Sequence, residues 1–456
     1  MTILGKRRAA YLSGTLLLAA GLLGHPSTAA ASPADSRTTG GSLLTAFEAA
    51  ASRSGVPRDL LIAVGYAETH LDGHGGTPSA TGGYGPMHLA HNPSVRTLDD
   101  AARLTGQPLS VLRTDSAANI AGAAAVLRSY ADADGLTEVA REDINAWYPA
   151  VVRYGGATDP SVARLYADTV YDLLAKGFAA PEHNLVVTGR AVAPQRGALS
   201  ALDTIGIQST DYGPAAWAPA STSNYTVANR ESDYNINYVV IHVTQGSYAG
   251  SISWFQNPAA KVSAHYIVRS SDGAITQSVR EKDIAWHAGN WTCNTQSIGI
   301  EHEGFVSDSS WFTDAMYRSS AALTRNLTTK YAIARDRSHI IGHVEVPGAT
   351  HTDPGQFWNW TYYMQLVNGI TGIGSGTVSV SGSTLNVRSG PGTGYAVVGS
   401  LANGATVSVY CQATGTTVTG TFGTTNIWNR IGTNRYVSDA YVNTGHSGFI
   451  PGVPRC

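Results

Sequence analysis

The spacing of apolar residues changes along the chain and divides it into segments of different expected structure. Between residues 41 and 180 the apolar positions follow a helical repeat, as at Leu60, Leu61, Val64 and Ala67, which share one face. We therefore expect an α-helical domain here.

The next two segments differ from the first and from each other. Residues 181–233 mix Ala, Pro, Ser, Thr and Asn with weak periodicity, which predicts a linker with a lead-in arm. Residues 238–242 form a short apolar run typical of a buried strand, and strand-like pieces and one long helix over 313–331 follow it. This order predicts a mixed α/β domain with a central β-sheet over residues 234–370.

The C-terminal segment has a third pattern. Residues 371–376 are Thr, Gly, Ile and Ser and predict a second linker. Over residues 377–456, short runs rich in Val and Thr are broken by Gly-Pro-Gly at 390–392 and by Asn403-Gly404. This pattern predicts a small all-β barrel, and the chain is therefore expected to be a multidomain protein.

The first 31 residues predict the compartment. A basic stretch at 6–8 precedes an apolar stretch at 9–23 and an Ala-rich cleavage site at 29–31, which together indicate a secretory signal peptide. The apolar stretch is shorter than the roughly 20 residues of a membrane-spanning helix. The two arginines of the basic stretch are also compatible with twin-arginine export. We expect a secreted, extracellular, wall-associated protein with no membrane contact after signal removal.

Charge and cysteine content limit the possible partners. The 456 residues carry a formal net charge of -2, which argues against nucleic acid as a partner. The three cysteines are Cys293, Cys411 and Cys456. Cys411 and Cys456 lie in the same C-terminal module, so we expect them to form the single disulfide. A monomer is the default expectation for a modular secreted protein.

Histidines cluster in the α/β segment. Seven of the fourteen histidines of the chain fall between His242 and His351. His242 ends the predicted buried strand, and His343 and Asp353 lie in and after another apolar run. Two imidazoles and one carboxylate, with a fourth position left for water, make up many catalytic zinc sites. Histidines with purely structural roles remain the alternative, because the spacing alone does not decide.

Five motifs in this segment occur in the order of one known family. They are YVVIHVTQG (238–246), VSAHYIVRSSDGAITQ (262–277), AWHAGNWTCN (285–294), SIGIEHEG (297–304) and HIIGHVEVPGATHTDPG (339–355). Together they resemble a type-2 N-acetylmuramoyl-L-alanine amidase, with the fold of peptidoglycan recognition proteins. The resemblance implies hydrolysis of the amide that joins the muramic-acid lactyl group to the L-alanine of the stem peptide. The glycan and the stem peptide of peptidoglycan are thus the expected partners.

The resemblance also implies roles for individual residues. It assigns Zn2+ to His242, His343 and Asp353, and it makes Glu301 the catalytic base that takes a proton from water. The family often has a lysine two residues before the last ligand, and this chain has His351 there. We expect His351 to stabilise the developing oxyanion, with activity falling as rising pH removes its proton.

Other residues of these motifs have two readings each. Trp286 and His287 are expected to line the substrate groove, with core packing as the alternative. His265 is a candidate substrate-binding residue that also fits a supporting or structural role. Strand alternation places Glu303 on the face of Glu301, where it is either a solvated charge or a supporting group. Of the two glutamates, only Glu301 is expected to be catalytic.

The helical segment carries a weaker resemblance. LLIAVGYAETHLDGHGG (60–76) and SATGGYGPMHL (79–89) resemble soluble lytic transglycosylases and goose-type lysozyme. This implies a lysozyme-like domain in which Glu68 is the catalytic acid that cleaves the glycan chain. His88 replaces the usual glutamine, and Gly155 replaces a frequent asparagine. A helical wall-binding or spacer domain is the alternative.

The C-terminal segment resembles a bacterial Src-homology-3-like domain, through LNVRSGPGTGYAVVGSLANGATVSVYC (385–411), IWNRIG (427–432) and RYVSDAYV (435–442). Such modules hold hydrolases on the cell wall. Trp428 and Tyr436 are either wall contacts or core residues. Three functions remain open: an amidase, a noncatalytic peptidoglycan-binding protein of the same fold, and an enzyme that mainly cleaves glycan chains.

Overall fold

The computed structural model describes most of the chain beyond the N-terminal segment. The described residues are 42–202, 208–230, 232–369, 374–382, 384–432, 434–451, 453 and 455–456. The signal peptide expected over 1–31 lies outside them. Within this described part, no helix is long and apolar enough to cross a membrane.

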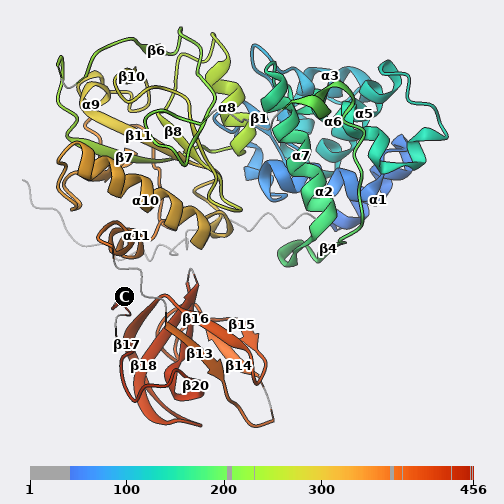
Figure 1. Ribbon diagram of the computed structural model, residues 1–456. Coiled ribbons are helices and arrows are strands. Elements are labelled where there is room, and N and C mark those ends of the chain that lie inside the picture. The colour runs from blue at the N-terminus through green and yellow to red at the C-terminus, as the bar shows by residue number, and fades with distance from the viewer. Residues whose placement is uncertain are drawn as a thin grey trace, which may run out of the picture. The chain divides into compact units, whose positions relative to one another are not determined.

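The first region is helical, as its apolar periodicity predicts. Side chains cap its helices, because Ser42, Asp115 and Asp159 each accept a hydrogen bond from a backbone N–H in the first turn. The helix that ends near Glu68 is buried along most of its length and lies in the middle of this core. The helices are α1 (Leu43–Ser54), α2 (Arg58–Thr69), α3 (Thr97–Thr105), α4 (Leu109–Thr114), α5 (Ser116–Ala133), α6 (Tyr148–Gly155) and α7 (Pro160–Lys176) (Figure 1).

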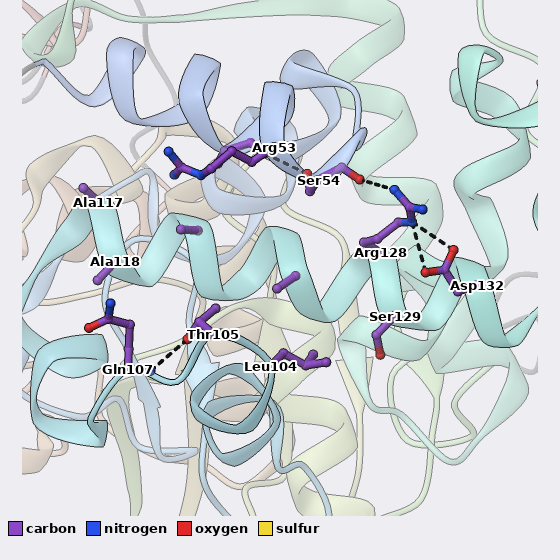
Figure 2. Close-up of a pocket in the computed structure, with 13 residues that line it drawn as sticks. Arg53, Ser54, Leu104, Thr105, Gln107, Ala117, Ala118, Arg128, Ser129 and Asp132 are labelled. Atoms are coloured by element: carbon purple, nitrogen blue, oxygen red, sulfur yellow. Dashed lines mark hydrogen bonds and ion pairs between the residues drawn. The ribbon is translucent and has the colours of Figure 1, made fainter. Parts of the chain in front are cut away.

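A surface groove of about 620 Å³ runs between α1, α3 and α5 in this region. Figure 2 shows that its floor is formed largely by α5, with Ala117 and Ala118 among the lining residues. Arg128 at one end donates to Asp132 at 2.9 Å and to the carbonyl oxygen of Ser54 at 2.7 Å. The charges of Arg128 and Asp132 are thus already paired with each other, and we assign no ligand to this groove.

The segment expected to be a linker, 181–233, contains more structure than its composition predicts. Strand β4 (Leu185–Thr188) pairs with β3 (Gly177–Ala180) in an antiparallel hairpin. Strands β5 (Ala216–Trp217) and β6 (Tyr225–Thr226) pair with strands of the following domain. Strands of two to four residues are too short to show an alternation of apolar and polar positions in the sequence, and pairing with other strands stabilises them.

A six-stranded sheet forms the centre of the α/β domain, in the order β12-β7-β11-β8-β9-β5. Its first four strands are parallel, and helix α10 (Asp314–Lys330) packs across one face through Met316, Leu323 and Leu327. The predicted helix over 313–331 agrees closely with α10. The other elements are β7 (Tyr238–Val243), α8 (Tyr248–Gln256), β8 (Tyr266–Val268), β9 (Ile275–Gln277), β10 (Ile284–Ala285), α9 (Trp291–Gln296), β11 (Ser297–His302), β12 (Ile340–Gly342) and α11 (Trp360–Val367).

The C-terminal module is built almost entirely from strands, in a five-stranded and a three-stranded sheet (Figure 1). Its first strand begins at Gly374, inside the expected 371–376 linker, because Gly374 to Thr377 pair with β16. Cys411 and Cys456 form a disulfide, and Cys293 is free. Trp428 is buried, which favours a core role over wall contact. The strands are β13 (Gly374–Val378), β14 (Leu385–Arg388), β15 (Val397–Leu401), β16 (Thr406–Val409), β17 (Cys411–Gly420), β18 (Gly423–Gly432), β19 (Arg435–Ser438) and β20 (Val442–Asn443).

Candidate functional site

Three adjacent parallel strands bring the candidate active-site residues together. The register pairs Glu301 on β11 with His242 on β7, so both side chains leave the same face of the sheet. Gly342 on β12 pairs with Ile241, which places His343 beside His242 at the ends of their strands. The opposite face is covered by α10. The candidate site therefore lies at the carboxyl ends of the parallel strands, on the face opposite α10.

His242, His343 and Asp353 form a compact group of buried side chains. One potential ligand atom from each lies within 4.8 Å of the others, and this is the only such group of three or more among the described residues. The Asp353 carboxylate is 3.3 Å from His242 Nδ1 and 3.2 Å from His343 Nδ1. Burial opposes ionisation of Asp353, but these two imidazoles hold its pKa well below the ordinary range.

The group has the donor set of a catalytic zinc site. Two imidazoles and a carboxylate suit zinc, and they leave room for a fourth ligand. Buried polar atoms point to a missing partner, since His343 Nε2 and Glu301 Oε2 have no hydrogen-bond partner among the described residues. Burial lowers the pKa of His242, which favours the neutral ring that a metal ligand must be. The residues present thus fit a metal ion.

Glu301 is placed to exchange protons at this group. Its burial, with a smaller contribution from the charge of Asp353, raises its pKa well above the ordinary value of a glutamate. A carboxyl group with a raised pKa both accepts and returns a proton near neutral pH. This property suits a general acid–base residue.

His351 lies beside the metal-ligand group on its exposed side. Its ring stacks on His343 with 4.6 Å between centroids and 16° between planes. His351 itself is exposed. The structure thus brings His351 to the candidate site, next to His343.

Two of the three residues expected to bind substrate have surroundings that differ from a substrate groove. His265 has no exposed surface and contacts Arg230, Asp283 and Gly299, so the expectation of substrate contact is wrong for this residue and the structural reading applies. His287 is also buried, and its Nδ1 lies 2.9 Å from His242 Nε2. It therefore supports a candidate ligand instead of lining an open groove.

Trp286 is the remaining member of that set and is half-buried. Its indole N–H donates to Thr226 Oγ1 at 3.0 Å. This hydrogen bond joins the β10 segment to the arm that precedes the domain. The partly exposed ring is compatible with both readings of Trp286, a groove contact and a packing residue.

Glu303 and His302 take structural positions. The Glu303 carboxylate is buried and accepts hydrogen bonds from the backbone N–H groups of Tyr248 and Ser270, both at 2.8 Å. It is therefore not a solvated charge, and it anchors the N-terminus of α8. His302 points to the other face of the sheet, as strand alternation predicts, where its Nε2 lies 2.6 Å from Ser320 Oγ.

Two residues near the site had no assigned role in the sequence analysis. Ser297 Oγ lies 3.1 Å from His287 Nε2, and Arg230 donates to the carbonyl oxygens of Glu281 and Ser297. Ser297 is the first residue of the motif that contains Glu301, and this position was the one feature of the sequence that could have indicated its place near the site. Arg230 lies outside the motifs, so only the tertiary structure reveals its contacts.

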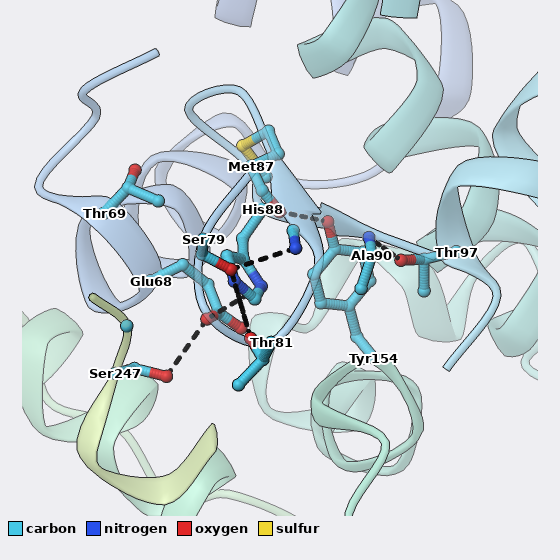
Figure 3. A network of polar contacts seen from close by, with 12 residues as sticks. Glu68, Thr69, Ser79, Thr81, Met87, His88, Ala90, Thr97, Tyr154 and Ser247 are labelled. Atoms are coloured by element: carbon cyan, nitrogen blue, oxygen red, sulfur yellow. Dashed lines mark hydrogen bonds and ion pairs between the residues drawn. The ribbon is translucent and has the colours of Figure 1, made fainter. Parts of the chain in front are cut away.

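The helical region places Glu68 in a second polar network, shown in Figure 3. Glu68 is buried at the end of α2, and Ser247 Oγ donates to its Oε2 at 3.1 Å. His88 Nδ1 lies 3.6 Å from the same oxygen, and His88 Nε2 is 2.7 Å from Ser79 Oγ. The network thus holds Glu68 between a loop of the helical region and the start of α8.

Close contacts surround both His88 and Gly155, the two positions that depart from the expected pattern. A Cβ at Gly83 would lie 2.1 Å from the His88 ring, so the bulky imidazole requires glycine opposite it. A Cβ at Gly155 would lie 2.4 Å from the Tyr166 ring, so this ring leaves no room for a larger side chain at position 155. Burial, and next the charge of nearby Glu68, raise the pKa of Tyr166 well above its ordinary value.

Comparisons with known proteins identify the α/β domain and the C-terminal module. Residues 232–356 match the N-acetylmuramoyl-L-alanine amidase family (Amidase_2), and residues 383–443 match the bacterial SH3 domain family. The chain is 42% identical over 176 residues to N-acetylmuramoyl-L-alanine amidase A of Achromobacter lyticus, covering 35% of this chain and 96% of that protein.

Two further similarities cover parts of the chain. The 1,6-anhydro-N-acetylmuramyl-L-alanine amidase AmpD of Haemophilus influenzae is 40% identical over 114 residues, which cover 24% of this chain and 59% of that protein. The solved structure of the catalytic domain of XlyA is 19% identical, with a TM-score of 0.27, over 33% of this chain and 97% of that domain. The fold and the site define a peptidoglycan amidase. The chain belongs to the N-acetylmuramoyl-L-alanine amidase family and is an enzyme of that class.

Proposed function

We propose that this amidase is a zinc enzyme in which His242, His343 and Asp353 hold the metal. The observation that carries the proposal is the convergence of these three buried side chains beside Glu301, with His343 Nε2 and Glu301 Oε2 lacking partners among the described residues. When bound, zinc supplies Lewis-acid activation of water and of the amide carbonyl.

The side chains of the protein perform the proton transfers. Glu301 accepts a proton from the attacking water as the new C–O bond forms at the amide carbon. The same carboxyl then donates this proton to the departing nitrogen as the C–N bond breaks, which releases a lactyl carboxyl group and a free L-alanine amino terminus. His351 is proposed to donate an N–H hydrogen bond to the developing oxyanion.

We propose that the enzyme is secreted and acts on the cell wall. Support comes from the signal-peptide pattern of residues 1–31 and from the SH3-type module, which would hold the enzyme on peptidoglycan. The proposed domain limits are 41–180 for the helical domain and 234–370 for the amidase, and we begin the wall-binding module at Gly374, where β13 starts.

Cleavage of the glycan chain is a second candidate activity, with Glu68 as its acid. One observation favours it: Glu68, Tyr154 and Tyr166 line the same cavity, which places the carboxyl group of Glu68 among aromatic rings. A partly apolar cleft with one carboxyl group suits protonation of a glycosidic oxygen. A wall-binding role for this region is the alternative.

Digestion of purified peptidoglycan distinguishes these activities. Free L-alanine amino termini that disappear after chelation and return with added Zn2+ are expected, together with about one zinc per chain by metal analysis. Chelator-resistant amidase activity in a chain without metal would contradict zinc dependence. New reducing or anhydro-sugar ends that are lost in Glu68→Gln would establish glycan cleavage, and their absence in the wild type would exclude it.

A further inference from the structure

We propose that His287 and Ser297 are positioning residues that fix the tautomer of His242 and direct its Nδ1 lone pair into the metal site. The inference rests on the proposed zinc dependence and extends it to residues outside the ligand set. It concerns the two buried residues whose hydrogen bonds lead away from the ligands toward α9.

Four groups form one chain of hydrogen bonds. His242 Nε2 lies 2.9 Å from His287 Nδ1, and His287 Nε2 lies 3.1 Å from Ser297 Oγ. Ser297 Oγ in turn donates to the backbone carbonyl oxygen of Cys293 at 2.6 Å. All three side chains that take part are buried.

The carbonyl at the end of this chain fixes its direction. A carbonyl oxygen only accepts, so the Ser297 hydroxyl donates to Cys293 and its oxygen receives the N–H from Nε2 of His287. The neutral His287 ring then has a lone pair on Nδ1, which accepts the N–H from Nε2 of His242.

This direction matters for metal binding. With its proton on Nε2, His242 has its lone pair on Nδ1, the atom that faces Asp353 at 3.3 Å. The other tautomer would direct an N–H into the metal site. Partners of this kind behind a ligand typically change metal affinity about 10- to 100-fold.

Zinc affinity measured by competition with a chromophoric chelator tests the role of His287. We expect His287→Ala to weaken zinc binding about 10- to 100-fold. His287→Asn should retain most of the affinity, because its amide oxygen replaces the Nδ1 acceptor. Ser297→Ala should bind zinc a few-fold more weakly than the wild type. His339 is a half-exposed histidine bonded to Asp336, so His339→Ala is the control and should bind zinc as the wild type does.

The visible spectrum of the Co2+-substituted chain provides a second measurement that a loss of packing alone would not change. We expect the His287→Ala spectrum to shift and the His287→Asn spectrum to stay close to that of the wild type. Equal zinc affinities and equal spectra for wild type, His287→Ala and Ser297→Ala would overturn the positioning role. A wild-type chain that binds neither metal would overturn this role and the zinc proposal together.

Independently, we infer that helix α8 closes the Glu68 cavity and must withdraw before a glycan chain can reach the carboxyl. This second inference rests on the proposed glycan cleavage. The cavity is about 40 Å³, and it is lined by Glu68 and His88 from the helical region and by Gly250 and Trp254 from α8. That space holds a few waters and no sugar ring.

Several contacts keep α8 in place. Ser247, the residue before α8, donates to Glu68, and Asn257 just after it donates to Ser94 at 2.6 Å. Ile252 and Phe255 of α8 belong to the same apolar cluster as Val162 of α7. Polar contacts at both ends of α8 and apolar contacts along it therefore hold this helix over the cavity.

Carbodiimide coupling of an amine to carboxyl groups, mapped by mass spectrometry in the full chain, tests the closure. Exposed Glu138 should react rapidly, and Glu68 should react at least about tenfold more slowly. Trp254→Ala should speed labelling of Glu68 several-fold and increase sugar-end release from peptidoglycan. Trp291→Ala, which removes an exposed tryptophan on α9, is the matched control and should change neither.

The outcomes separate closure from glycan cleavage. Labelling of wild-type Glu68 as fast as that of Glu138 would overturn the closure, as would an unchanged rate in Trp254→Ala. Faster labelling in Trp254→Ala without any sugar-end release would support the closure and refute glycan cleavage by Glu68.

Discussion

Glu301 and Glu303 lie two residues apart at the end of β11 and should respond in opposite ways to the same substitution. Glu301 Oε2 is buried without a hydrogen-bond partner among the described residues, whereas both Glu303 oxygens accept backbone N–H groups. We expect Glu301→Gln to remove activity and leave stability nearly unchanged. We expect Glu303→Gln to lower stability and leave turnover within a few-fold of the wild type below its melting temperature.

The contacts determine the expected magnitudes. Loss of a general acid–base residue costs about 10²- to 10⁴-fold in rate, or about 3–5 kcal/mol in activation free energy. In Glu303→Gln, the amide NH2 would face one of the two backbone N–H groups and leave it unpaired. A buried unpaired donor costs about 1–3 kcal/mol of unfolding free energy, or roughly 2–12 °C in melting temperature for a domain of this size.

Two measurements on each zinc-loaded variant test this pair. Release of free L-alanine amino termini from peptidoglycan gives the rate, and scanning calorimetry gives the melting temperature. The reasoning fails if Glu301→Gln keeps more than a tenth of the wild-type rate. It also fails if Glu303→Gln melts with the wild type, or if the two variants show the same combination of losses.

Three further predictions concern other regions. Asp308 has a pKa of about 2, since burial raises this pKa but hydrogen bonds with His70 and Ser310 lower it further. The resulting stabilisation, up to about 2 kcal/mol, is present above about pH 4 and is lost as the pH falls toward 2. Asp308→Asn should therefore reduce the fall in melting temperature between pH 5 and pH 2. Cys411→Ser removes the disulfide with Cys456, which joins residues 45 positions apart. This change should lower the free energy of unfolding of the C-terminal module by roughly 4 kcal/mol in a denaturant titration. An unchanged denaturation midpoint would argue against the disulfide. Gly155→Ala should lower the free energy of unfolding by about 1–3 kcal/mol, because the added methyl group would overpack against the Tyr166 ring. An unchanged melting temperature would show that this ring moves aside freely.

Much of the amidase domain follows from local sequence. The apolar run ending at His242 folds as β7, and alternation along β11 correctly separates Glu301 from His302. The helix expected over 313–331 differs from α10 by one residue at each end. These features depend on side-chain period and chain-local hydrogen bonds, which a single sequence displays.

The sequence by itself thus determined the class of enzyme, and it predicted the order of the domains and the side chains of the candidate metal site. The tertiary structure alone decided which groups stand behind them. His287 supports His242 across 45 positions, and Ser247 reaches Glu68 across 179 positions. Neither contact has a local period or a turn signature, because packing between distant elements creates it. The pattern of a sequence predicts which residues share one face of a helix or strand. Only the folded chain determines which other residues that face contacts.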